Sequence, residues 1–293
     1  MVRTPSARPD PGSGSGLLTL HEAADRLGVH YMTAYRYVRT GRLPATKVGS
    51  QWWVDPRALA GARQGTVVAG RPRAHTRQST RAAAARRLER RLVAGDEAGA
   101  WAIVEARLGS GSDPDDVLLD ELALAMRAVG DGWEAGDYTV DDEHRATGVA
   151  TRMVGRLGAR FTRRGPKRPS VILGTPPHEL HGLPTSMAAN VLSGRGYDVV
   201  DLGADVPTDA FAAAVTKAAR PLAVGVAVTA GNHDRSVRAI VRAVREVRPG
   251  LPVLVGGAGI AGEQHAARLG ARWSGQDARE LGEVVEDLER RSP

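Results

Sequence analysis

From residue 170 onward, four short apolar runs alternate with stretches long enough for an amphipathic helix. The runs are SVILGT, YDVVDLG, LAVGVAVT and LPVLVGG, which begin at residues 170, 197, 222 and 251. Strands that alternate with helices require crossover connections, and these predict a doubly wound parallel sheet, the Rossmann-like α/β class. In such sheets ligands bind beyond the carboxyl ends of the strands. We therefore expect a binding site formed by residues 175–184, 203–207, 229–234 and 256–262.

Residues 79–161 show a different pattern, rich in Ala, Leu, Arg and Glu at helical spacing and without the alternation typical of strands. Breaks near residue 95, at 109–114 and at 136–137 divide the segment into four helices, which predicts a four-helix bundle. The residues predicted to cap these helices are Ser79, Asp96, Asp113 and Thr139.

Residues 17–60 predict a small winged helix-turn-helix domain. Thr19 and Glu22 have the spacing of a capping box, Gly28 follows as a turn, and a second helix is expected over residues 30–40. The text RLPATKVGSQWWV after it predicts a β-hairpin wing. In this motif the second helix enters the major groove of DNA. The side chains expected to reach DNA are Tyr31, Thr33, Arg36, Arg39, Arg42, Lys47 and Gln51.

Charge is distributed unevenly along the 293 residues, whose net charge is +7. Residues 1–91 hold 17 arginines and lysines against five acidic residues, a net charge of +12. The remaining residues hold 23 basic and 28 acidic side chains, a net charge of −5. A biased arginine usage is an alternative explanation, but it would not separate the two signs. The pattern favours a polyanion-binding head on a mildly acidic body.

The rest of the composition excludes several classes of protein. The absence of cysteine excludes disulfide scaffolds, zinc ribbons, thiol catalysis and iron–sulfur clusters. No run approaches 18 apolar residues, so no membrane span is expected. Residues 1–16 lack the apolar core of a signal peptide and predict a disordered tail. We expect a cytoplasmic protein with domains at 17–60, 79–161 and 170–293, and a basic linker at 61–78.

His181 lies just past the first predicted strand, in GTPPHELHGLP, with Glu179 two residues before it. A carboxylate beside an imidazole fixes its tautomer and makes it a better metal donor. The alternative is an ordinary surface histidine. A second motif, GAGIAG at 257–262, matches the dinucleotide fingerprint, but its strand is the fourth of the sheet and no second half follows. This context argues against NAD(P) or FAD.

The first and last domains resemble known families. The text from LTLHEAADRLGV to SQWWV is similar to the short, excisionase-like form of the MerR superfamily. The region after residue 170, with DLGADVP at 201–207, resembles the cobalamin-binding domain. The resemblance implies that His181 is the lower axial ligand of cobalt and that the displaced nucleotide base enters a tunnel in the sheet. The residues implied to contact the cofactor here are Glu179, His181, Gly182, Leu183, Ala227, Thr229, Gly256 and Gly257.

Three positions depart from the pattern of that domain. Pro184 stands where the family usually has glycine, Ala227 where it has the tunnel serine, and Glu179 where aspartate is commoner. With alanine at position 227, one hydrogen bond to the base is expected to be missing.

The bundle contains Trp133 followed, after nine residues, by Glu143 and His144. This spacing resembles the light-sensing, adenosylcobalamin-dependent regulators of the CarH/LitR group. The resemblance implies that Trp133 lies over the adenosyl group with Glu143 and His144 beside it. The alternative is a core tryptophan and a helix-terminal acid. Glu134 stands where some of these photoreceptors have the histidine that captures cobalt after photolysis.

Together these patterns predict a transcriptional repressor, not an enzyme, that senses light through adenosylcobalamin. One short helix-turn-helix reads few base pairs, so binding to operator DNA implies a homo-oligomer, a dimer or a tetramer. Methylcobalamin is an alternative cofactor. Alternative functions are a light-independent sensor of cobalamin or another tetrapyrrole, and a corrinoid carrier subunit of a methyltransferase.

Overall fold

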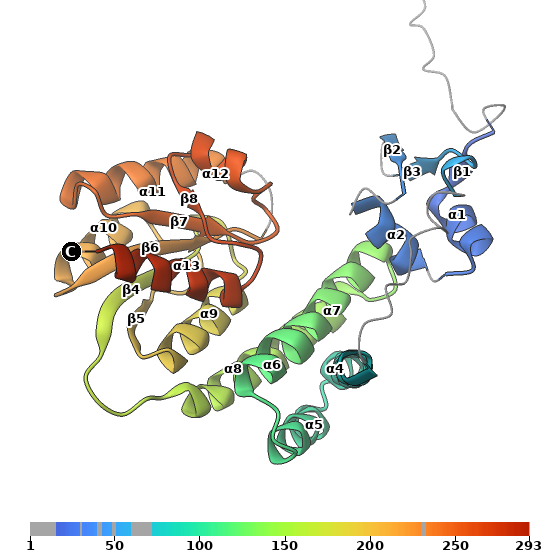
Figure 1. The fold of residues 1–293 in the computed structure, drawn as a ribbon, viewed down its shortest axis with the longest axis horizontal. Helices are drawn as coiled ribbons and strands as arrows, with labels where there is room; N and C mark the ends of the chain where they lie inside the picture. Colours follow the sequence, from blue (N-terminus) through green and yellow to red (C-terminus); the bar gives the residue numbers. More distant parts are fainter. Residues whose placement is uncertain are drawn as a thin grey trace, which may run out of the picture. The chain divides into compact units, whose positions relative to one another are not determined.

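The computed structural model describes residues 16–29, 31–39, 43–48, 51–59, 72–229 and 233–292 (Figure 1). The chain divides into two compact units, Met1–Arg71 and Pro72–Pro293. Within the described ranges, no helix combines the length and the apolar character needed to cross a bilayer.

The first unit combines two helices with a small antiparallel sheet of order β1-β3-β2. Helix α1 begins with the predicted capping box, because the Thr19 side chain accepts from the Glu22 amide and the Glu22 carboxylate accepts from the Thr19 amide. It ends at Gly28, whose φ of 69° suits glycine. The elements are β1 (Leu18–Thr19), α1 (Leu20–Leu27), α2 (Tyr31–Arg39), β2 (Ala45–Val48) and β3 (Gln51–Val54).

The second unit begins with a four-helix bundle. Its third helix is continuous but contains a π-helical segment, η1, in which each backbone bond spans one residue more than in an α-helix. The bundle consists of α4 (Pro72–Val93), α5 (Glu97–Gly109), the run α6 (Pro114–Asp116), η1 (Val117–Leu122) and α7 (Ala123–Ala135), and α8 (Val140–Phe161).

Three of the four predicted helix caps are confirmed. Asp96, Asp113 and Thr139 each accept a hydrogen bond from a backbone amide of the first turn. The prediction for Ser79 was wrong, because α4 begins at Pro72 and residue 79 lies inside it. Proline is well suited to a first helical position, where its missing N–H would have no partner within the helix.

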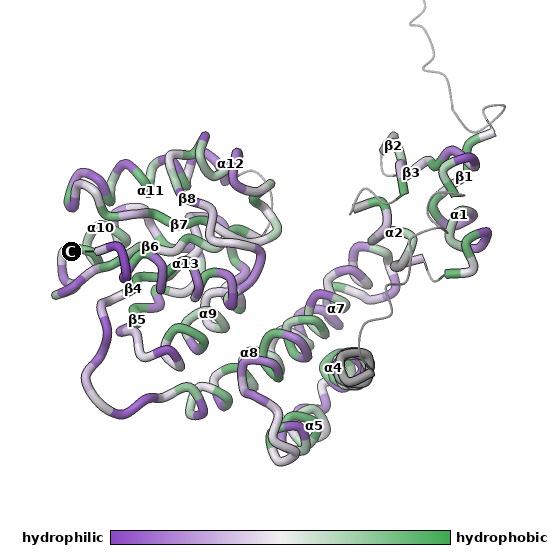
Figure 2. Tube along the Cα trace, viewed as in Figure 1, coloured by the Kyte–Doolittle hydropathy of each residue, from purple (hydrophilic) through white to green (hydrophobic). Residues whose placement is uncertain are grey.

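The bundle packs around an apolar core, and its helices alternate between hydrophobic and hydrophilic residues along their length (Figure 2). At the edge of this core, the Arg156 guanidinium lies 3.8 Å from the ring centroid of Trp101. The fully buried core side chains include Leu88, Leu92, Val104, Leu118, Leu122, Val129 and Leu157.

The rest of the second unit is a parallel sheet of order β5-β4-β6-β7-β8. This is one of the two common orders of doubly wound folds, so the predicted fold class of this domain is confirmed. The short strand β8 was not predicted. The strands are β4 (Arg168–Gly174), β5 (Tyr197–Asp201), β6 (Pro221–Ala227), β7 (Val253–Gly256) and β8 (Arg272–Trp273).

Helices cover both faces of this sheet (Figure 1). Alternate strand residues point to opposite faces. Ile172, Val224 and Val255 join the apolar cluster beneath α10 and α11, whereas Val171 and Leu173 join the cluster shared with α9, α13 and the bundle. The helices are α9 (Leu183–Gly194), α10 (Thr208–Lys217), α11 (Asp234–Val247), α12 (Glu263–Arg268) and α13 (Ala278–Arg291).

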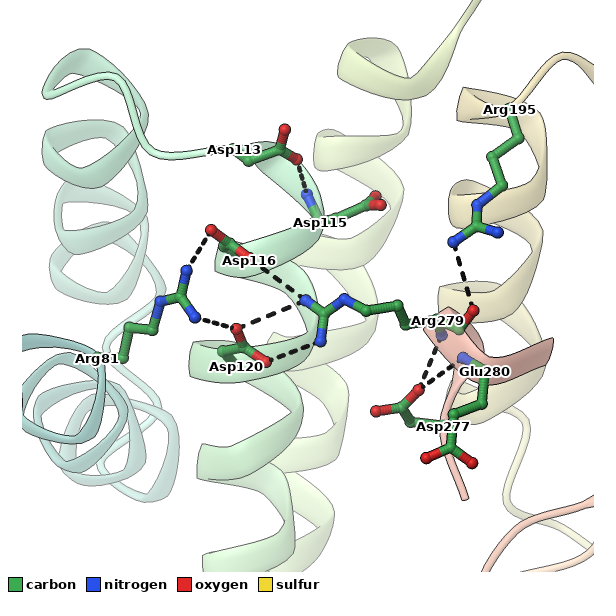
Figure 3. A network of polar contacts seen from close by, with 9 residues as sticks. All are labelled: Arg81, Asp113, Asp115, Asp116, Asp120, Arg195, Asp277, Arg279 and Glu280. Atoms are coloured by element: carbon green, nitrogen blue, oxygen red, sulfur yellow. Dashed lines mark hydrogen bonds and ion pairs between the residues drawn. The ribbon is translucent and has the colours of Figure 1, made fainter. Parts of the chain in front are cut away.

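The bundle and the sheet are joined by polar contacts as well as by a shared core. Asn190 on α9 donates to the Val154 carbonyl of α8 at 2.9 Å. Asp116 and Asp120, one turn apart on α6 and η1, lie between two arginines from different layers (Figure 3). Arg81 of α4 reaches both carboxylates from one side, and Arg279 of α13 reaches both from the other.

Candidate functional site

Two loops at the carboxyl edge of the sheet are bound to each other, one after β4 and one after β5. The hydroxyl of Thr175, fully buried, donates to the Glu179 carbonyl at 2.5 Å and accepts from the Asp205 amide at 2.9 Å. The amide of His178 donates to the Asp205 carboxylate at 2.7 Å. His178 and Asp205 both have positive φ, 68° and 52°. A loop with this many constraints holds the residues that follow in a defined position.

Glu179 is the buried centre of the β4 loop, with 1% of its surface exposed. Its Oε1 accepts from the backbone amide of His181 at 3.1 Å and lies 2.5 Å from His181 Nδ1. Its Oε2 accepts from the Thr229 amide, at the end of β6, at 2.9 Å. One carboxylate therefore connects the loop after the first strand of the sheet to the end of the third.

The Glu179 carboxylate determines which nitrogen of the neutral His181 ring carries the hydrogen. A carboxylate only accepts hydrogen bonds, so Nδ1 carries the hydrogen and the lone pair of the neutral ring is on Nε2. Within the described part of the chain, Nε2 has no hydrogen-bond partner, and 58% of the side chain is exposed. This arrangement presents an oriented nitrogen donor at the carboxyl edge of the sheet, as a metal-binding histidine requires.

A pocket opens beside this loop, between the sheet and the helices α9 and α13. Its empty space, which is open to solvent on one side, is about 480 Å³. It lies on the sheet face that carries Gly225, Ala227 and Gly256 near the strand ends, where small residues leave room above the sheet. The lining residues are Leu173, Pro184, Thr185, Ala188, Gly225, Val226, Ala227, Gly256, Gly257, Ser274, Gly275, Gln276, Asp277, Ala278 and Leu281.

The two glycines at the end of β7, Gly256 and Gly257, have no room for a side chain. A Cβ at Gly256 would lie 2.5 Å from Ser274 Oγ and 2.8 Å from the Gly275 carbonyl oxygen. Gly257 has a φ of 99°, and a Cβ there would lie 2.5 Å from the Val228 carbonyl oxygen. Backbone therefore forms this wall, and a flat or elongated group can approach it closely.

The structure groups the predicted cofactor residues in two places. Ala227, Gly256 and Gly257 line the pocket, whereas Glu179, His181 and Gly182 belong to the loop beside it. Leu183 begins α9, and Thr229 takes part through its backbone amide. Pro184, the unusual residue of the loop motif, stands in the first turn of α9. Sequence reasoning missed the pocket residues Thr185, Gly225, Ser274 and Gly275.

The bundle residues predicted to cap a cofactor lie at adjacent helix ends. Trp133 is near the end of α7 with 47% of its surface exposed, and Glu143 and His144 are in the first turns of α8. Glu143 accepts from Thr147 Oγ1 at 2.7 Å and lies 3.0 Å from His144 Nδ1. Of these three side chains, all described, none has a hydrogen bond or ion pair to His181.

The structure reaches only part of the predicted DNA surface. Tyr31 is partly buried against the core of the first unit, with its ring centroid 5.0 Å from that of His21. The other predicted contacts fall outside what the structure describes. Arg42 lies outside the described residues, and the same holds for the side chains of Thr33, Arg36, Arg39, Lys47 and Gln51.

Three matches to protein families cover these parts of the chain. The family described as B12 binding domain matches residues 169–282, and a second family with the same description matches residues 84–157. The family described as helix-turn-helix domain matches residues 17–60.

Similar curated proteins are corrinoid proteins. The chain is 24% identical over 191 residues to trimethylamine corrinoid protein 1 of Methanosarcina acetivorans, covering 64% of this chain and 88% of that protein. It is 22% identical over 131 residues to a corrinoid protein of Desulfitobacterium hafniense, covering 43% of this chain and 60% of that protein.

A solved structure shares the fold. The monomethylamine corrinoid protein of Methanosarcina barkeri superposes with a TM-score of 0.59 at 20% identity, covering 69% of this chain and 96% of that one. The residues present also fit a corrinoid, because an oriented imidazole stands beside a glycine-walled pocket. The matches and this geometry together support a cobalamin-binding protein that carries a helix-turn-helix domain at residues 17–60.

Proposed function

We propose that this protein is a transcriptional regulator that binds operator DNA through residues 17–60 and is controlled by cobalamin bound to the second unit. The observation that carries the proposal is the order of the matches, a helix-turn-helix domain followed by two B12-binding segments in one chain. The net charge of +12 over residues 1–91 supports a nucleic-acid partner for the first unit.

In this proposal, different residues of the second unit would hold different parts of the cofactor. His181, oriented by Glu179, would hold the cobalt ion through Nε2. The pocket lined by Ala227, Gly256 and Gly257 would hold the nucleotide base that this histidine displaces. The exposed Trp133, with Glu143 and His144 nearby in sequence, would contact the cofactor from the bundle.

The finer proposal is that the regulator responds to light. When bound, adenosylcobalamin supplies a cobalt–carbon bond that visible light has enough energy to break. Arg279 of α13 joins Asp116 and Asp120 of the bundle, so a change in the position of the bundle relative to the sheet would alter these ion pairs. We propose a repressor that binds DNA as a homo-oligomer in the dark and releases it in the light.

A corrinoid carrier subunit of a methyltransferase is the second candidate, and the names of the similar proteins favour it. The helix-turn-helix match argues for the regulator. The superposed corrinoid protein is covered over 96% of its length by 69% of this chain, so this chain has a substantial segment beyond that shared fold.

The test uses the full chain, purified and mixed with adenosylcobalamin in darkness. Absorbance reports binding of the cofactor, gel filtration reports the oligomer, and gel retardation with DNA from upstream of the gene reports operator binding, each before and after green light. His181→Ala is the site variant. Glu105→Gln, a surface carboxylate with 58% of its side chain exposed, is the control.

The three readouts separate the candidates. DNA retardation that requires cobalamin and is lost in green light supports the light-responsive regulator. Retardation that requires cobalamin but ignores light indicates a sensor of cobalamin itself. Cobalamin binding without any DNA binding favours the carrier, and a protein that binds no cobalamin refutes all three.

A further inference from the structure

Ser274 is a largely buried residue whose hydroxyl group lines the pocket. Only 5% of its surface is exposed, and it lines the pocket directly after β8. Its backbone amide donates to the Val255 carbonyl at 3.0 Å. Among the described residues, its Oγ has no hydrogen-bond partner. Its hydrogen is therefore available to a ligand in the pocket that can accept a hydrogen bond.

The strand pattern explains why this hydroxyl faces the pocket. Trp273 packs against the apolar cluster beneath α10 and α11, so the next residue points to the opposite face of the sheet. That face is where Gly256 stands, and Ser274 Oγ would be 2.5 Å from a Cβ at that glycine. The absence of a side chain at Gly256 leaves the hydroxyl accessible from the pocket.

The other polar side chains of the pocket are already engaged or exposed. Thr185 donates its hydroxyl hydrogen to the Gly182 carbonyl at 2.7 Å. The carboxylate of Asp277 caps α13 by accepting from the amides of Arg279 and Glu280. Gln276 is exposed to solvent. Ser274 is therefore the buried side chain of this pocket that has a hydrogen to donate.

Ala227 lacks a donor, so the hydroxyl hydrogen of Ser274 matters more for a ligand in this pocket. It lines the same pocket at the end of β6, and its methyl group offers no hydrogen bond. An aromatic base held in this pocket would bring a ring nitrogen with a free lone pair. Buried without a donor, that nitrogen would lose the hydrogen bonds it makes in water.

We propose that Ser274 Oγ donates a hydrogen bond to the ring nitrogen of the nucleotide base of cobalamin, a contact that Ala227 cannot make. The inference rests on the proposed binding of cobalamin. It makes Ser274 a residue that selects corrinoids whose lower base is a nitrogen heterocycle, and it assigns the hydroxyl to the nucleotide tail alone. Binding of the corrin ring, and of cobalt by His181, does not depend on Ser274.

The test compares two ligands that differ only in the tail. Adenosylcobalamin carries the nucleotide base, whereas adenosylcobinamide has none. Dissociation constants for both are measured in darkness by calorimetry with the full chain. We expect Ser274→Ala to weaken adenosylcobalamin about 5- to 20-fold, the range of a buried hydrogen bond, and to leave adenosylcobinamide unchanged.

Two further variants make the result specific. The double variant Ser274→Ala with Ala227→Ser returns a hydroxyl to the pocket from the end of β6, opposite Gly256, and should recover part of the affinity for adenosylcobalamin. Ser186→Ala removes a hydroxyl that bonds Asp201 outside the pocket and should leave both constants unchanged. Thermal unfolding without cofactor shows that each variant is folded.

The outcomes distinguish this inference from the proposed function. Unchanged affinity of Ser274→Ala for adenosylcobalamin, or an equal loss for both ligands, overturns the role of Ser274 and leaves cobalamin binding intact. If the unaltered protein binds neither ligand, the proposed function fails and the inference fails with it.

Discussion

Glu179→Gln is the substitution that most directly tests how the β4 loop is held. Glutamine keeps the size and shape of the side chain but replaces one carboxylate oxygen with an NH₂ group. Both oxygens of Glu179 accept backbone hydrogen bonds, Oε1 from His181 and Oε2 from Thr229. Whichever way the amide is turned, one backbone N–H faces another donor.

The magnitude follows from those contacts. With 1% of the residue exposed, water cannot replace the lost acceptor. A buried donor left unpaired costs about 1–3 kcal/mol, and hydrogen bonds to a charged acceptor are stronger than those to an amide. We expect a loss of about 2–3 kcal/mol. For a domain of this size that is a fall of about 5–10 °C in the melting temperature.

The assay is thermal unfolding of the cofactor-free chain, followed by circular dichroism, with two comparisons. His181→Ala retains Glu179 and its backbone bonds and removes a ring that is 58% exposed, so its melting temperature should change little while cobalamin affinity falls. Glu105→Gln should be neutral for both. A melting temperature of Glu179→Gln within about 1 °C of the unaltered protein would refute the reasoning, because the carboxylate would then not be holding the loop.

Three further predictions follow from other parts of the second unit. Gly256→Ala places a Cβ 2.5 Å from Ser274 Oγ and should abolish cobalamin binding in calorimetry, whereas Gly155→Ala, with open space at its Cβ, should not. Asp120→Asn removes a negative charge that pairs with both Arg81 and Arg279. We expect the free energy of unfolding to fall by up to about 1 kcal/mol, seen as a lower melting temperature than that of the unaltered protein at low salt, with the difference disappearing at high salt. Burial raises the pKa of Glu289, but hydrogen bonds from an arginine and a tyrosine outweigh burial and lower that pKa below its usual range. Glu289 therefore stabilises the fold above its unfolded pKa, and the higher melting temperature of the unaltered protein relative to Glu289→Gln should vanish as pH falls through the folded pKa. A difference in melting temperature that persists at low pH would contradict this.

Local sequence signals predicted the features that depend on neighbouring residues. The capping box of Thr19 and Glu22 and the caps at Asp96 and Asp113 each act within three residues of the chain, so their spacing is sufficient to predict them. The prediction at Ser79 failed because the start of α4 depends on how far the helix continues toward Pro72. Serine is a common capping residue, but the residues next to Ser79 do not show whether it lies at the start of a helix or inside one.

The sheet shows the same division. Four apolar runs predicted β4, β5, β6 and β7, because buried parallel strands need continuous apolar residues. Strand β8 has two residues, Arg272 and Trp273, and no such run. It exists because β7 offers an edge for it to pair with, which is a property of the assembled sheet.

By itself, the sequence determined the order of the modules, the parallel α/β class, and the pairing of Glu179 with His181, since these depend on composition, period and short spacing. Only the tertiary structure decided that Glu179 also binds the Thr229 amide, 50 residues away, and that Ser274 faces the pocket beside Gly256. Both contacts join segments that meet only when the strands align. A hydroxyl without a partner is visible only when everything around it is in place.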